Sequence, residues 1–153
     1  MLFRAAEESF RKGLEALERE PGKKALALFE AAIELDRRLG AARPQARYLS
    51  YYGLCLALGA HRVVEGLRFC REAKDLEFFN PDLYCNLGRV LLAAGRRRDA
   101  YEALCQGYRL EPAHPGIRRE LGAMGKRRRP VLPFLDRGNA VNRILARIAA
   151  PRR

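Results

Sequence analysis

The sequence predicts an all-α fold, a right-handed solenoid of three helix pairs that ends in a capping helix. Two observations predict it. Small residues recur at nearly the same spacing in three parts of the chain. Helix start and stop signals also divide the chain into segments of helical length, in which apolar residues recur at steps of three and four.

A ladder of small residues marks each predicted helix pair. Its clearest copy runs through Gly88, Ala100, Leu104 and Gly107, with steps of 12, 4 and 3 residues. The same steps relate Gly13, Ala25, Phe29 and Ala32, while the ladder of Gly53, Gly66, Cys70 and Ala73 is one residue longer at its first step. Glycine inside a helix costs about 1 kcal/mol relative to alanine, so it needs a packing reason. We therefore expect the glycine of each first helix to face a small residue of the second, while Phe29 and Leu104 fill the gap to the next pair.

Residues that favour the start or the end of a helix set the expected helix boundaries. Asn80-Pro81-Asp82 combines an N-cap, a proline at the first helical position and an acidic residue, which is a strong helix start. Gly59 and Gly95 are expected to end first helices, and His114-Pro115 to begin the capping helix. The expected helices are 3–19, 23–38, 45–58, 62–78, 81–94, 97–110 and 115–124.

The segment Pro81–His114 resembles the tetratricopeptide repeat (TPR) family. It has the family's length of 34 residues, and its small and apolar positions fall on the family pattern at Tyr84, Leu87, Gly88, Leu91, Gly95, Ala100, Leu104, Gly107 and Pro112. The second unit departs from it by one residue in its turn, and the first has Lys12 and Ala16 where apolar residues are usual. The resemblance covers residues 3 to 124. It implies a non-catalytic scaffold that binds proteins through a concave groove lined by the first helices.

Eleven residues are expected to line this groove. Arg47, Asn86 and Arg89 could hold a carboxylate, because arginine forms paired hydrogen bonds to one; alternatively, they are ordinary surface or packing residues. Phe10 and Leu14 stand where polar residues would be needed to grip a chaperone C-terminus, so a peptide or helix of apolar or mixed character fits better. The eleven are Phe10, Leu14, Leu17, Arg47, Ser50, Tyr51, Leu54, Cys85, Asn86, Arg89 and Leu92.

A basic extension is expected to follow the array, with the array at 1–124 and the extension at 125–153. Of the net charge of +12, residues 117–153 carry +9. The cluster Lys126, Arg127, Arg128 and Arg129 makes nucleic-acid or anionic-surface binding the alternative function. An amphipathic helix is expected at about 140–149, with Val141, Ile144, Leu145 and Ile148 as its apolar stripe. This helix either folds back on the repeats or binds a partner or an anionic membrane surface.

Chemistry-bearing residues are few and scattered. The sequence contains no dinucleotide, phosphate-loop, zinc-protease or nucleophile-elbow motif, so we expect no enzymatic activity and no cofactor. Cys55, Cys70, Cys85 and Cys105 lie at no metal-binding spacing, so we expect them to pack as small apolar residues. No export signal or apolar span is visible, which makes a cytoplasmic protein the expectation.

Overall fold

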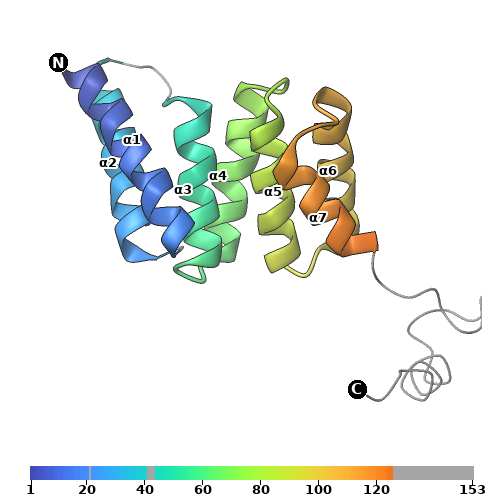
Figure 1. Cartoon of the computed structure of the whole chain (residues 1–153). Coiled ribbons are helices and arrows are strands. Elements are labelled where there is room, and N and C mark those ends of the chain that lie inside the picture. The colour runs from blue at the N-terminus through green and yellow to red at the C-terminus, as the bar shows by residue number, and fades with distance from the viewer. Residues whose placement is uncertain (21, 41–43, 126–153) are drawn as a thin grey trace, which may run out of the picture. The chain divides into compact units, whose positions relative to one another are not determined.

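The computed structural model describes residues 1–20, 22–40 and 44–125, which form seven α-helices (Figure 1). Their bounds lie within one or two residues of the predicted ones. The predicted extension, with its basic cluster and its helix at about 140–149, lies outside the described residues apart from Gly125. The helices are α1 (Leu2–Arg19), α2 (Lys23–Arg38), α3 (Ala46–Leu58), α4 (Val63–Leu76), α5 (Pro81–Ala93), α6 (Arg97–Leu110) and α7 (Pro115–Gly125).

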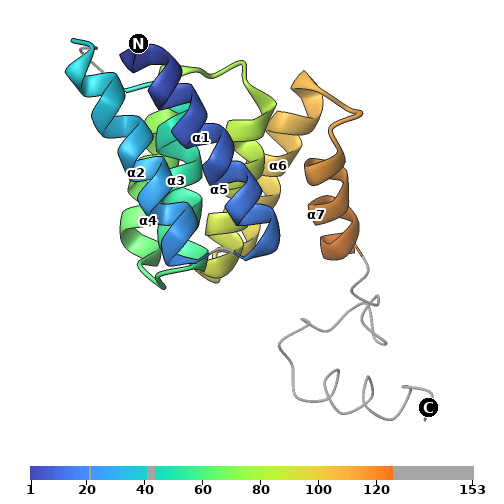
Figure 2. The same cartoon turned by 60° about the vertical axis from the view of Figure 1, so that its left-hand side comes forward.

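Consecutive helices pack as the antiparallel pairs α1–α2, α3–α4 and α5–α6, and α3 and α4 both pack on α5. Because directions alternate along the chain, α1, α3, α5 and α7 begin at one edge of the array and α2, α4 and α6 end there (Figures 1 and 2, upper edge). The described parts of the α1–α2 connection and the α3–α4 and α5–α6 turns lie at the opposite edge. The predicted arrangement of three pairs plus a further helix is confirmed.

The glycine ladder packs differently in the three pairs. In the middle pair, Gly53 and Gly66 meet backbone to backbone, and a Cβ on Gly66 would lie 2.4 Å from the carbonyl oxygen of Gly53. In the outer pairs, a Cβ on Gly13 would lie 2.7 Å from the Phe29 ring, and one on Gly88 would lie 2.6 Å from Leu104 Cγ. Phe29 and Leu104 therefore pack within their own pairs. Phe29 also reaches the next pair, as expected, because its ring centroid lies 5.7 Å from that of Tyr51 on α3.

The helix starts and turns follow from particular residues. The Asn80 side chain accepts a hydrogen bond from the Asp82 backbone N–H at 3.1 Å, which confirms the predicted cap of α5. Gly95 adopts the left-handed region with φ +72° directly before α6. Before α4 the same place is taken by His61, with φ +57°, and Gly59 keeps an ordinary φ of −94°. The α3–α4 turn is one residue longer than the α5–α6 turn. It thus has a histidine in the left-handed position that a glycine takes in the α5–α6 turn.

Two buried side chains join the start of one helix to the helix before it. Asp36 at the end of α2 is buried, and its carboxylate accepts a hydrogen bond from the Gln45 backbone N–H at 2.9 Å, which ties the start of α3 to the end of α2. Ile117 on α7 is fully buried, and a Cβ on Gly107 of α6 would lie 2.6 Å from its side chain. The start of α7 therefore covers apolar surface of the last pair, which is the role expected of a capping helix.

Candidate peptide-binding groove

The first helices of the three pairs share one continuous face. The rings of Phe10 on α1 and Tyr51 on α3 pack edge to face, with 5.5 Å between their centroids. The Asn86 amide on α5 donates a hydrogen bond to the Ser50 hydroxyl on α3 at 3.1 Å. Side chains at the predicted positions therefore lie next to one another across α1, α3 and α5. We call this surface the first-helix face.

Burial divides the eleven predicted groove residues into two groups. Five of them are buried and hold the helices together: Phe10, Ser50, Leu54, Cys85 and Asn86. The other six remain partly accessible: Leu14, Leu17, Arg47, Tyr51, Arg89 and Leu92. A buried side chain mainly supports a binding surface, so most of the direct contact with a partner falls to the second group.

Arg47 is already paired within the chain. Its guanidinium forms an ion pair with Glu7 of α1, which also accepts a hydrogen bond from the Tyr48 hydroxyl. The same guanidinium lies 5.2 Å from the ring centroids of both Phe10 and Tyr48. Burial, together with the hydrogen bond to Glu7, raises the pKa of Tyr48. The carboxylate partner expected for this arginine is thus supplied by α1.

The other two polar residues of the predicted groove also have internal partners. Asn86 is buried against Ser50, and the Arg89 Nε lies 3.7 Å from the Glu120 carboxylate of α7. Tyr51, next to both, is mostly buried, and this burial raises its pKa to about 12. The expected carboxylate-binding set is therefore largely compensated inside the protein, and the accessible remainder of the face is mainly apolar.

A shallow hollow of about 400 Å³ opens on α1. Sequence reasoning missed Phe3 and Glu7 here, although Phe3, Glu7, Phe10 and Leu14 follow steps of 4, 3 and 4, which place them on one face of a helix. That spacing was the available signal. The lining is Phe3, Arg4, Glu7, Glu8, Phe10, Arg11, Leu14 and Arg47.

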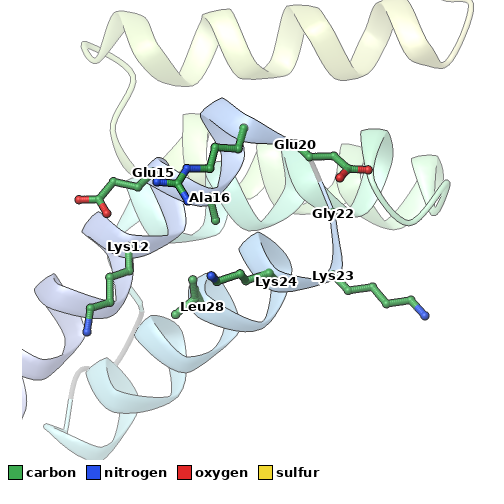
Figure 3. A pocket seen from close by; sticks show the side chains of 9 residues that line it. Lys12, Glu15, Ala16, Glu20, Gly22, Lys23, Lys24 and Leu28 are labelled. Carbon is green, nitrogen blue, oxygen red and sulfur yellow. The ribbon is translucent and has the colours of Figure 1, made fainter.

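A second hollow, of about 540 Å³, lies where α1 ends and α2 begins (Figure 3). It contains none of the eleven predicted groove residues. The Lys24 side chain extends across it beside Leu28, whereas Lys23 and Glu20 point away (Figure 3). Four cationic and two acidic side chains line it, and Lys12 among them forms an ion pair with Glu8 at 3.3 Å. Most of the side chains that line this hollow are therefore charged.

Reactive side chains are buried or dispersed. Burial raises the pKa of Cys55 and Cys85 to about 11 and that of Cys70 to about 12, so these thiols are protonated and inert at neutral pH. Among the described residues, no group of three His, Cys, Asp or Glu side chains is placed to hold a metal ion. Within the same part of the chain, no helix combines the length and apolarity needed to cross a membrane.

Comparison with known proteins supports the fold. No family model matches the sequence, and no curated protein matches it. Among solved structures, the chain is similar to the TPR domain of OM64 from Arabidopsis, with a TM-score of 0.65 and 18% sequence identity. The match covers 82% of this chain and 98% of that domain. The described residues thus have the fold of a TPR domain.

Proposed function

We propose that this protein is a non-catalytic scaffold and that its first-helix face binds an apolar peptide, or the apolar side of one helix, from a partner protein. The fold supports the general role, because TPR-type arrays present extended surfaces for protein ligands. The observation that carries the ligand class is the internal pairing of Arg47 with Glu7 and of Arg89 with Glu120. An acidic ligand would have to displace carboxylates that the chain already provides.

The accessible apolar side chains of this face supply the binding energy in the proposal. Leu14, Leu17 and Leu92 are partly exposed. Leu14 and Leu17 pack against the buried cluster that contains Phe10, and Leu17 and Leu92 against the one that contains Leu54. Apolar area removed from water contributes about 25 cal/mol per Å², largely independent of salt. The expected complex therefore tolerates high ionic strength.

Affinity capture with matched variants tests the groove. The full chain, Leu14→Glu and Val64→Glu are used as baits in extract of the native cell, at low and at high salt. Val64 is a suitable control because it is 84% exposed and lies on α4, a second helix. We expect the same partner with the wild type and with Val64→Glu at both salt concentrations, and its loss with Leu14→Glu. Retention of the partner by Leu14→Glu would falsify the groove assignment.

Nucleic-acid or anionic-surface binding is the alternative, and it has less support. Its main residues, 126–129, lie outside the described residues. The basic run at residues 96–98 could supply further charge, but Arg96 is paired with Asp99 and Arg98 with Glu102. This function predicts binding to a nucleic-acid probe that falls steeply with salt and disappears when residues 125–153 are deleted. Unchanged binding after the deletion argues against the basic extension as its source.

A further inference from the structure

Exposed apolar side chains gather at one edge of the helix array. The start of α1, the ends of α2 and α6, and the α4–α5 loop all lie at this edge (Figures 1 and 2). Large apolar side chains are exposed at every one of these places. We call this set the apolar edge, and it consists of Leu2, Phe3, Leu39, Phe78, Phe79 and Leu110.

The α4–α5 loop holds its two phenylalanines in a fixed position. Phe78 is 70% and Phe79 65% exposed, and their rings pack edge to face at 5.6 Å. The Tyr84 hydroxyl donates a hydrogen bond to the Phe78 carbonyl at 2.8 Å, and the Asn80 amide donates one to Glu77 at 3.2 Å. The aromatic pair is therefore displayed by an ordered loop. An ordered loop loses little entropy when it binds, which favours its use as a contact.

Acidic residues flank this aromatic pair in the sequence. Asp75, Glu77 and Asp82 all lie within four residues of it, with Lys74 as the nearest lysine or arginine along the chain. Lys74 is paired with Asp75 at 2.6 Å and the His114 ring lies 2.8 Å from Asp82, and three carboxylates against one lysine leave an excess of negative charge at this part of the edge. The surface is thus apolar and acidic at once, which is poorly suited to an anionic membrane.

The other end of the same edge is basic. Arg4 in the first turn of α1 and Arg37 and Arg38 in the last turn of α2 are exposed there, beside Leu2, Phe3 and Leu39. Arg38 forms an ion pair with Glu34 of its own helix at 3.1 Å. The apolar edge therefore carries positive charge at the α1–α2 end and negative charge at the α4–α5 loop.

We propose that the apolar edge binds a second copy of this chain, edge to edge, to form a two-fold symmetric dimer. A two-fold axis that passes between these two parts of the edge, perpendicular to its length, brings each part against the other part in the partner copy. The acidic α4–α5 loop then faces the basic α1–α2 end in both copies, and the exposed phenylalanines and leucines are removed from water. Such an interface is closed, so it yields a dimer and no filament.

Sedimentation equilibrium of the full chain over the micromolar range tests the dimer. We expect a concentration-dependent dimer for the wild type. The double variant Phe78→Ser, Phe79→Ser should raise the dimer dissociation constant by at least about tenfold. Val64→Ser removes an even more exposed apolar side chain at the start of α4, on the opposite edge, and should leave the dissociation constant unchanged.

A charge exchange tests which ends of the edge meet. Glu77→Arg and Arg37→Glu should each weaken the dimer, and their combination should restore it, because the pair is re-formed with reversed sign across the axis. A wild type that is monomeric throughout, or a combination no stronger than the single variants, overturns the proposal. So does binding of the monomer to phosphatidylglycerol vesicles that is lost in the phenylalanine double variant, because it assigns the edge to lipid.

Discussion

The two junctions between successive helix pairs are formed by different kinds of side chain. At the first junction, Phe10 of α1 packs against Tyr48 and Tyr51 of α3, with ring centroids 5.0 and 5.5 Å apart. At the second, the small polar pair Ser50 and Asn86 joins α3 to α5. The first junction is thus aromatic, whereas the second combines a buried polar pair with aliphatic side chains such as Leu54 and Val90. Both junctions nevertheless join helix pairs that carry a similar ladder of small residues in the sequence.

Removal of an aromatic ring from the first junction should have the largest effect on stability. Phe10→Ala leaves a cavity among Phe29, Tyr48 and Tyr51 and should lower the free energy of unfolding by about 3–5 kcal/mol. Urea unfolding at an unchanged m-value measures it. A loss below about 1 kcal/mol would mean that neighbouring side chains move in to fill the cavity, and that the junction does not require the Phe10 ring.

The middle pair should be the least tolerant of an added methyl group. Gly66→Ala pushes a Cβ against the Gly53 carbonyl and Ala57, which are parts of a neighbouring helix, and should cost about 2–3 kcal/mol. Gly88→Ala meets the Leu104 side chain, which can move more easily, so about 1–2 kcal/mol is expected. Comparison of the two urea midpoints checks this. Equal losses of stability would show that the backbone contact between Gly53 and Gly66 accommodates a methyl group as well as the Leu104 side chain does.

The sequence predicted the helices well because their signals are local. Asn80 caps its own helix, and the ladder steps relate residues within one pair. The partners of the groove arginines were not predictable in this way. Arg47 and Glu7 lie 40 residues apart, and Arg89 meets Glu120 across two helix connections. Burial of Leu54 and Cys85 likewise depends on how neighbouring units pack, which one unit's pattern does not encode.

Alkaline pH should affect the buried cysteines before the tyrosines of the first junction. Buried Cys55, Cys70 and Cys85 have pKa values of about 11 to 12 in the folded chain, above the value of about 8.5 for a free thiol. A raised folded pKa means that the stabilisation is complete below about pH 8.5 and is lost as pH rises toward the folded value.

The tyrosines of the first junction should also stabilise the fold less as pH rises, but at higher pH than the cysteines. The pKa of Tyr51 is about 12 when folded, against about 10 for free tyrosine, so its contribution declines only above about pH 10. Urea unfolding from neutral to alkaline pH should therefore show a first loss of stability near pH 9 that Cys70→Ala reduces. Stability that stays constant up to about pH 11 would contradict the burial of these thiols.

The turn of the second unit should allow a small gain in stability. His61 occupies the left-handed position that Gly95 fills in the third unit. Since this region is strained for residues with a side chain, His61→Gly should raise the free energy of unfolding by about 0.5–1 kcal/mol. Gly95→Ala, at φ +72°, should lower it by a similar amount. Thermal unfolding of both variants checks these two predictions. Changes in stability of the same sign would refute the equivalence of the two turns.

The central claim is that the first-helix face binds through apolar contact, because its arginines are already paired with Glu7 and Glu120. Calorimetric titration of the captured partner, at low and at high salt and at several temperatures, tests it most directly. We predict a dissociation constant that changes less than about threefold with salt and a negative heat-capacity change, the mark of apolar burial. A dissociation constant that rises by orders of magnitude with salt, with no heat-capacity change, would contradict the account.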